Sequence, residues 1–424
     1  MRIAIFIPGF QKDEFDWCIP AFTNLAAELS REAEVHVFTL RYPQVRAYYR
    51  VSGVHVHAVG GGALNGIRLP GISLVKLWAD LLHLFDRVHR KTHFDVLVGI
   101  WATESGALAC AAGRRWGLPV LVHLAGGELV SLNSIGYGNW GRGLAGALVG
   151  VSLKYANKIT VPSTHMEELL RLRHPVACKR ATLWPLGVDT ELFSRPDGEV
   201  DSLTEPFTFV TVASLLPVKG LDLYVDAAAE LRATHPDYKF RVFIVGEGPE
   251  RTRLAAKIAL LGLEGYVVLV GERNHSELPA IFARSHCFVM TSWHEAQGMA
   301  LLEAAAAGLP WIATPVGAAT DMARSMQPSG YLLADRNPST MADTMHTMMQ
   351  LSPGEREAMG REARSQVLTS FDLRQQAPIL LGHLRALTST RVGRRIKAHS
   401  PRSVTLDVIT LMRELAVISL LGRK

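Results

Sequence analysis

Short apolar runs alternate with longer segments of helical periodicity along the first half of the chain. The strand-like runs are "RIAIFIP", "AEVHVFTL", "FDVLVGI" and "PVLVHLAG". Between them, "AFTNLAAELSRE", residues 72–91 and "ESGALACAAGRRWG" repeat apolar residues at helical spacing. Apolar strands that alternate with helices are typical of βαβ units, in which helices cover both faces of a parallel sheet.

The pattern lapses at 195–206 and then resumes. "SRPDGEVDSLTEP" has Pro, Gly, Ser and acids without an apolar period, which is typical of a linker. Strand-like runs then return as "FTFVTVASL", "YKFRVFIVGEG", "YVVLVGE", "HCFVMTS" and "PWIATPVG". The predicted fold class is therefore α/β, with two tandem Rossmann-like domains at residues 1–198 and 206–370, followed by a helix at 371–388 and an extension at 389–424.

One strand-to-helix turn combines two carboxylates with a helix start. In "TSWHEAQGMALLEAAAAG", Glu295 precedes the predicted helix, Gly298 begins it, and Glu303 lies about 7 Å further along its axis. The amides of Met299 and Ala300 lack partners within a helix that begins there, so they favour a phosphate. Ligands of parallel sheets bind beyond the carboxyl ends of the strands, where this turn is expected.

A diphosphate flanked by two polyols, such as a nucleotide-sugar, would suit this layout. Glu303 would accept hydrogen bonds from ribose hydroxyls and Glu295 from hydroxyls of the sugar, because carboxylates are pure acceptors. The alternative is structural: Glu295 caps the helix and Glu303 is an ordinary helical acid.

Two other turns carry residues suited to a diphosphate. Lys219, in "ASLLPVKGLDL", follows the first strand of the second half, and its ammonium would neutralise phosphate charge. Gly246 and Gly248, in "VGEGPERTRL", would allow close backbone approach. The alternatives are that Lys219 is an ordinary surface lysine and that the turn with Gly246 and Gly248 belongs to a dinucleotide site.

Composition narrows the class of protein. Four scattered cysteines without a C-x-x-C pair predict neither a disulfide framework nor a zinc site, and favour a reducing cytosol. The first apolar run ends at Pro8-Gly9, as a strand would, and is too short for a signal peptide. The chain contains no uninterrupted run of about 18 apolar residues, so no membrane-spanning helix is expected.

The net charge of +6 is modest and partly concentrated in two stretches, 41–50 and 391–402. These are either solvated surface or a site of attraction to an anionic membrane face or a phosphorylated substrate. No nucleic-acid partner is predicted, because no binding motif accompanies the charge.

Near the C-terminus, an apolar stripe at helical spacing either packs on the protein or a second subunit, or lies on a membrane surface. The stripe consists of Val404, Val408, Leu411, Leu415 and Ile418.

Several segments together resemble the retaining glycosyltransferases of family four, which have the GT-B fold. They are "SLLPVKG", "VGEGPE", "TSWHEAQGMALLEAAAAGLPWIATPVGA", "WPLGVDTELF" and "GLPVLVHLAGGEL". The third contains the family's E-x7-E pattern as Glu295 and Glu303. The resemblance covers roughly residues 1–388 and is more specific in the C-terminal half.

The resemblance implies a deep cleft between the domains, with the nucleotide-sugar donor on the second domain, the acceptor on the first, and a last helix that returns to the first domain. It implies that Glu303 binds the ribose, Glu295 the donor sugar and Lys219 the diphosphate. His123 matches a family histidine near the sugar and phosphate, and Gly9 matches the first-strand turn that approaches the phosphate.

The sequence departs from the family pattern at several positions. Ser214 stands where many relatives have an arginine that binds the diphosphate, and Arg273 in "GERNH" is a candidate substitute. "EAQG" replaces the usual "EGFG", and Gln297 would alter discrimination between hexoses. "LGVD" replaces "NGVD", and the first-strand turn has one glycine where many relatives have two.

The predicted reaction is transfer of a hexosyl group to an acceptor hydroxyl with retention, in bacterial envelope polysaccharide or glycolipid synthesis. The predicted acceptor is a sugar or a lipid-linked glycan. The enzyme is expected to be cytoplasmic, and the more specific alternative is peripheral binding at the inner face of the cytoplasmic membrane. No D-x-D motif occurs, so no metal or other cofactor is expected. The alternatives are a nucleotide-sugar epimerase of the same fold, a non-catalytic scaffold subunit of the GT-B fold and, more distantly, a dinucleotide-dependent oxidoreductase.

Overall fold

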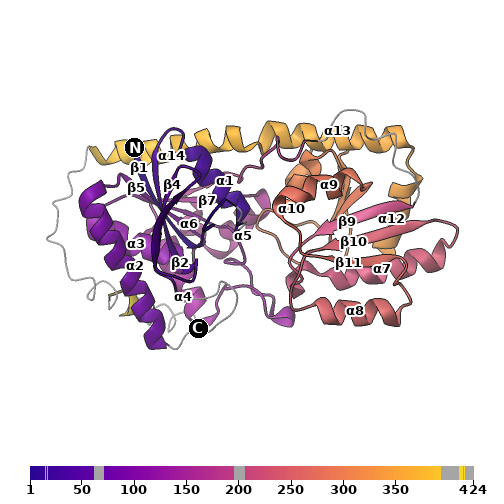
Figure 1. Ribbon diagram of the computed structural model, residues 1–424, viewed down its shortest axis with the longest axis horizontal. Coiled ribbons are helices and arrows are strands. Elements are labelled where there is room, and N and C mark those ends of the chain that lie inside the picture. The colour runs from indigo at the N-terminus through magenta and orange to yellow at the C-terminus, as the bar shows by residue number, and fades with distance from the viewer. Residues whose placement is uncertain are drawn as a thin grey trace. The chain divides into compact units, whose positions relative to one another are not determined.

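The apolar runs of the sequence form two separate sheets that are parallel except for the antiparallel pair of strands at 47–51 and 54–58 in the first (Figure 1). The computed structural model describes residues 1–14, 16, 18–61, 71–194, 206–392, 410–413 and 415. The chain divides into a first unit (Met1–Pro162, Met166–Leu186 and Arg374–Lys424) and a second unit (Ser163–His165 and Gly187–Leu373). The predicted class of two parallel-sheet α/β domains is confirmed.

The first unit contains an eight-stranded sheet of order β3-β4-β2-β1-β5-β6-β7-β8. β1 has the burial of a central parallel strand, because five consecutive residues from Ile3 to Ile7 are apolar and almost fully enclosed. The strands are β1 Arg2–Gly9, β2 Glu34–Tyr42, β3 Ala47–Val51, β4 Val54–Ala58, β5 Val96–Ile100, β6 Val120–His123, β7 Lys158–Val161 and β8 Ala181–Leu183. The helices are α1 Pro20–Leu29, α2 Gly71–Thr92, α3 Glu104–Trp116, η1 Asn133–Ile135, α4 Gly143–Tyr155, α5 Thr164–Arg173, α6 Pro175–Cys178 and α14 Leu373–Val392.

The second unit contains a six-stranded, all-parallel sheet of order β11-β10-β9-β12-β13-β14. Neighbouring residues of β9 alternate between two cores: Phe209 packs in one cluster and Val210 in the other. The strands are β9 Phe207–Val212, β10 Phe240–Val245, β11 Val267–Gly271, β12 Cys287–Met290, β13 Trp311–Ala313 and β14 Gly330–Leu332. The helices are η3 Pro217–Lys219, α7 Leu221–Thr234, α8 Arg251–Leu260, η4 His275–Glu277, α9 Leu278–Ala283, α10 Met299–Ala306, α11 Ala319–Met322, α12 Pro338–Gln350 and α13 Pro353–Ser370.

Apart from the short segment Ser163–His165, the second unit begins at Gly187, before the predicted boundary between 198 and 206. The Val188 amide donates to the Phe371 carbonyl at 2.7 Å, and the Phe193 side chain is buried in the core of the second unit. Residues 187–194 therefore belong with the second unit because their contacts are made there. Residues 195–205, which make up nearly all of the predicted linker, lie outside the described residues.

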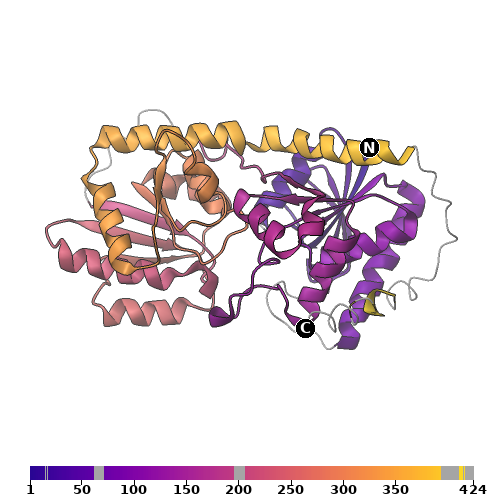
Figure 2. The same ribbon diagram turned by 180° about the vertical axis from the view of Figure 1, so that it is seen from behind.

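The predicted return of the last helix to the first domain is confirmed. From Arg374 onward, α14 clusters with the first unit. The Trp184 indole donates to the Gln376 carbonyl at 3.0 Å, and Arg385 donates to Glu32 at 3.1 Å. Figure 2, which views the molecule from behind, shows α14 as a long yellow helix.

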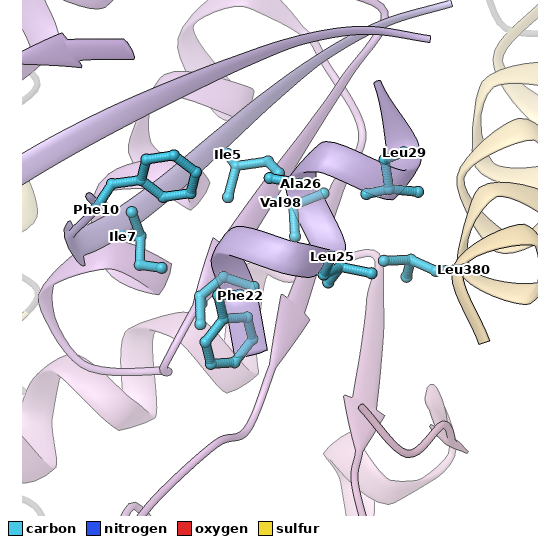
Figure 3. Close-up of a pocket in the computed structure, with 10 residues that line it drawn as sticks. Ile5, Ile7, Phe10, Phe22, Leu25, Ala26, Leu29, Val98 and Leu380 are labelled. Carbon is cyan, nitrogen blue, oxygen red and sulfur yellow. The ribbon is translucent and has the colours of Figure 1, made fainter. Parts of the chain in front are cut away.

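A small apolar gap lies between α1 and the sheet of the first unit (Figure 3). Its lining residues are all aliphatic or aromatic: Ile5, Ile7, Phe10, Phe22, Leu25, Ala26, Leu29, Val98, Ile100 and Leu380. In the close-up, Leu380 of α14 lies beside Leu25 and Leu29 of α1. Because no polar side chain lines it, this gap is unsuited to a sugar or a phosphate.

Of the two basic stretches, the structure describes the first almost alone. In the stretch 41–50, Arg41 forms a 2.8 Å ion pair with Glu104, and Arg46 lies 3.9 Å from Asp80. These two cations therefore face carboxylates of their own domain. The second stretch lies outside the described residues beyond Val392.

Two residues of the C-terminal apolar stripe are described, and both are buried: Leu411 is 4% exposed and Leu415 is 3% exposed. Their burial favours packing on the protein over binding to a membrane. Val404, Val408 and Ile418 lie outside the described residues. Within the part of the chain that is described, no helix has the length and hydropathy needed to cross a bilayer.

Candidate active site

The sheet order of the second unit defines where a ligand should bind. β9 is flanked by β10 on one side and β12 on the other, so the connections leave the sheet in opposite directions between β9 and β12. Ligands of open α/β sheets bind outside the carboxyl ends of the strands at such a switch point. The turns that follow these two strands carry Lys219 and Glu295.

Lys219 and Glu295 are in direct contact across the switch point. The Lys219 ammonium lies 2.6 Å from the Glu295 Oε1 atom. The two turns approach closely because Gly220 has a φ of 57°, and a Cβ atom there would lie 2.5 Å from the Thr291 carbonyl. Only glycine fits this position without displacing one of the turns.

Glu295 is held as a carboxylate. Ser292 donates a second hydrogen bond to Oε1 at 2.6 Å. Burial acts to raise the pKa of Glu295, but the Lys219 ammonium and the two hydrogen bonds outweigh it and hold the pKa below its usual value. A charged carboxylate in this position is suited to accept hydrogen bonds from hydroxyl groups.

Arg336 supports the turn that carries Glu295. Its guanidinium donates to the carbonyls of Thr291 at 2.7 Å and Ser292 at 3.1 Å, and it lies 3.8 Å from the centre of the Trp293 ring. Arg336 follows β14, more than 40 residues from this turn in the sequence. The backbone before Glu295 is therefore fixed by a cation from another strand end.

α10 begins beside Glu295, as predicted. Gly298 caps the helix with a φ of 89°, a left-handed conformation that favours glycine. The amides of Met299 and Ala300 lie in the first turn, where an α-helix provides no carbonyl partner. The helix start therefore offers donors and partial positive charge to an anion.

Glu303 has a partner that the sequence analysis missed. His275 Nε2 lies 2.9 Å from Glu303 Oε1. His275 begins η4, in the turn after β11, whereas Glu303 lies on α10. The turn "GERNH" was singled out in the sequence only for Arg273, and nothing in its sequence indicates which carboxylate the histidine reaches.

The close backbone approach predicted at Gly246 and Gly248 occurs, but within the protein. A Cβ atom on Gly246 would lie 2.0 Å from the Ala213 carbonyl, and one on Gly248 would lie 2.6 Å from the Leu215 carbonyl. Both glycines therefore allow the turn after β10 to pack on the turn after β9. The side chain of Ser214, in that second turn, is exposed.

Arg273 does not join the Lys219–Glu295 pair. Its guanidinium donates to the carbonyl of the neighbouring Glu272 at 2.8 Å, and the residue is exposed. Its proposed role as a substitute cation for the missing arginine at position 214 has no supporting contact among the described residues.

The remaining predicted site residues belong to the first unit. Gly9 ends β1 beside an irregularity in its pairing with β2. His123 ends β6 and is buried, with Nδ1 lying 3.0 Å from the Thr160 hydroxyl and Trp184 packed on its ring. Burial lowers the pKa of His123 to about 3, so the imidazole is neutral at physiological pH.

A buried carboxylate in the loop that follows His123 was also missed. Glu128 is fully enclosed and accepts hydrogen bonds from the amides of Ala102 at 3.2 Å, Ala125 at 3.1 Å and Gly126 at 2.7 Å. It therefore joins the turns after β5 and β6. Among the described residues, no group of three or more His, Cys, Asp or Glu side chains is arranged to hold a metal ion.

Comparison with known proteins agrees with this fold. Residues 197–366 match the family described as glycosyl transferases group 1, and residues 19–187 match the glycosyl transferase 4-like domain. The chain is 30% identical over 329 residues to a D-inositol 3-phosphate glycosyltransferase of Acidothermus cellulolyticus, covering 73% of this chain and 67% of that protein.

Two further similarities differ in extent. A 2-deoxystreptamine glucosyltransferase of Streptomyces kanamyceticus is 28% identical over 242 residues, which cover 55% of this chain and 61% of that protein. The crystal structure of the Anabaena protein HepE in complex with UDP-glucose has a TM-score of 0.69 at 17% identity, covering 91% of this chain and all of that one. Sequence and fold together show that the chain belongs to the family-four glycosyltransferases of the GT-B fold, which transfer a sugar from a nucleotide-sugar donor.

Proposed function

We propose that the protein is a retaining hexosyltransferase that uses a nucleoside diphosphate-sugar and requires no metal ion. The observation that carries this proposal is the contact of Lys219 with Glu295 at the switch point, beside the start of α10. Lys219 and the amides of Met299 and Ala300 hold the diphosphate, and Glu295 accepts hydrogen bonds from the donor sugar. Glu303 binds the ribose.

The reaction breaks the bond between the anomeric carbon and the diphosphate oxygen and forms a bond from that carbon to the acceptor oxygen. The acceptor's proton passes to the departing phosphate oxygen, so attack occurs on the face that the leaving group vacates and the configuration is retained. Lys219 and the helix start stabilise the negative charge that develops on the diphosphate. Neutral His123 and Gly9 are proposed to lie near the sugar and phosphate, with Gly246, Gly248 and Ser214 beside the nucleotide.

A covalent route through Glu295, as in retaining glycosidases, fits the site less well. The carboxylate already accepts hydrogen bonds from Lys219 and Ser292, which reduce its strength as a nucleophile. Proton NMR of the product with an anomerically pure donor tests retention, and an unchanged rate in excess EDTA tests independence from metal. An inverted product or an EDTA-sensitive rate would contradict the proposed mechanism.

We propose UDP as the donor nucleotide, supported by the fold shared with the UDP-glucose complex of HepE. The direct test is a thermal-shift panel of UDP, GDP, ADP and their common sugar conjugates, run on the wild type and Glu303→Ala. UDP should stabilise the wild type at sub-millimolar concentration, and Glu303→Ala should lose most of that shift because the ribose loses its charged acceptor. An equal shift in both proteins would reject the proposed role of Glu303.

The acceptor is proposed to be a sugar or a lipid-linked glycan of bacterial envelope synthesis. Similarity to a D-inositol 3-phosphate glycosyltransferase supports a hydroxyl acceptor on a polyol. Product analysis with the donor alone separates this proposal from an epimerase, which would convert the donor without any acceptor. A scaffold subunit would give no product under either condition.

We further propose that the enzyme works at the cytoplasmic face of an anionic membrane, through the α5–α6 corner, defined here as Arg171–Lys179. Leu172 and Val176 are 75% and 68% exposed, and Arg171, Arg173 and Lys179 flank them. No acid occurs between Leu169 and Val188, and the exposed Glu168 lies one helical turn before Leu172, so cations outnumber acids around the two apolar side chains. Exposed apolar groups among cations are suited to an anionic lipid surface.

Sedimentation with vesicles tests this surface. The wild type should bind vesicles rich in phosphatidylglycerol but not pure phosphatidylcholine, and the double variant Leu172→Gln/Val176→Gln should bind at least about threefold more weakly. Leu260→Gln is the matched control, because Leu260 is 86% exposed but lies in the second unit. Equal binding of all three proteins would contradict the proposal.

A further inference from the structure

The ribose-binding carboxylate proposed above does not stand alone in the structure. Glu303 and His275 are joined by the 2.9 Å contact between Oε1 and Nε2, and their side chains are only 10% and 17% exposed. At this distance the imidazole N–H donates to the carboxylate, which is acceptor-only when ionised. The pair forms one unit made from the turn after β11 and the helix after β12.

His275 is itself held in place from two sides. The ring of Phe193 lies against it edge-on, with ring centres 5.1 Å apart and an interplanar angle of 77°. Its backbone begins η4, which is closed by a capping box in which the Asn274 amide donates to the Glu277 carboxylate at 2.8 Å. The imidazole therefore has a defined position before any ligand binds.

This arrangement leaves one carboxylate oxygen for a ligand. Oε1 of Glu303 is engaged by His275, and within the described part of the chain Oε2 accepts no hydrogen bond from the protein. A carboxylate has lone pairs on both oxygens, and a ribose presents two neighbouring hydroxyls to it. Fixing one oxygen restricts the rotation of the side chain and so reduces the entropy lost when the ribose binds.

We propose that His275 is a positioning residue that orients Glu303 toward the ribose and thereby sets the preference for ribonucleotides over deoxyribonucleotides. The inference rests on the proposed role of Glu303 and adds to it a residue that does not touch the reacting atoms. A carboxylate in a fixed position rejects a ligand that lacks a hydroxyl, because a buried acceptor is then left unpaired.

The test is isothermal titration with UDP, 2′-deoxy-UDP and 3′-deoxy-UDP on five proteins: the wild type, His275→Leu, His275→Gln, His235→Leu and Glu303→Ala. The wild type should bind UDP about tenfold or more tightly than at least one deoxy analogue. His275→Leu removes the N–H donor at similar volume and should reduce this ratio to within about threefold, chiefly by weakening UDP binding. His275→Gln retains an N–H donor in reach of Glu303 and should keep most of the ratio.

His235→Leu is the control for a histidine lost from the same unit, because His235 stacks on His346 rather than on the site. It should leave the ratio unchanged. In steady-state assays, His275→Leu should raise the KM for the donor while kcat at saturating donor changes less than about threefold. A purely structural role would lower the thermal stability without changing the ratio.

The experiment distinguishes failure of the proposed role of Glu303 from failure of the proposed role of His275. If Glu303→Ala, titrated in parallel, keeps the preference for ribose, the proposed role of Glu303 is wrong. If Glu303→Ala loses the preference but His275→Leu keeps it, the ribose site is retained and the positioning role of His275 is rejected.

Discussion

Replacing Lys219 with alanine should lower kcat by about 10³-fold, because this ammonium is proposed to stabilise the charge on the departing diphosphate. The effect should be large because Ser214 stands where relatives supply a second cation, and Arg273 is engaged with the Glu272 carbonyl. Lys219→Arg keeps the charge and should recover part of the rate. Initial rates with saturating donor and acceptor measure the change.

Lys257 provides a closely matched control. Like Lys219, it forms a 2.6 Å ion pair in the second unit, and both lysine side chains are 24% exposed. Lys257, on α8, pairs with Asp226 on α7 and not with a residue of the turns that carry Lys219 and Glu295. Lys257→Ala should therefore keep activity within about threefold of the wild type. If both alanine variants lose the same activity, Lys219 is only structural and the proposed charge stabilisation is wrong.

The first unit should lose about 3 kcal/mol of stability between pH 7.5 and pH 5.5. Burial lowers the pKa of both His57 and His123 from 6.5 to about 3. Between these values the unfolded chain binds protons that the folded chain does not, so acidification favours unfolding. Each histidine contributes about 1.4 kcal/mol at pH 5.5, and the loss grows until pH approaches 3.

Calorimetry across this pH range measures the effect as a fall in the unfolding temperature of the first unit. His57 lies 3.0 Å from His36, so His57→Gln keeps a hydrogen-bonding group there while removing the titration. This variant should lose about 1.4 kcal/mol less on acidification than the wild type. His83→Gln, on the exposed side of α2, is the control for a histidine replaced in the same unit. A wild type equally stable at both pH values would contradict the prediction.

Neighbouring residues explain why parts of the site were predictable. Gly298, Met299 and Ala300 follow a strand and begin a helix, and both elements have local sequence periods. The E-x7-E spacing likewise lies within a single turn and helix. These features needed no knowledge of which strands are neighbours.

Other features depend on contacts between distant segments. His275 and Glu303 are 28 residues apart, and Arg336 reaches carbonyls 44 and 45 residues away. Gly246 was interpreted as a ligand-facing glycine, whereas its missing Cβ makes room for the Ala213 carbonyl. The start of the second unit at Gly187 depends on the pairing of the next residue, Val188, with Phe371, which local composition does not encode.

Local patterns were enough to predict two mainly parallel sheets, the strand ends that carry polar residues and the family, because each depends on a local period or a short motif. The tertiary structure decided which side chains share a site: Lys219 with Glu295, and His275 with Glu303. The reason is physical. Strand order brings together turns that are distant in the chain, and only that order determines which charge faces which.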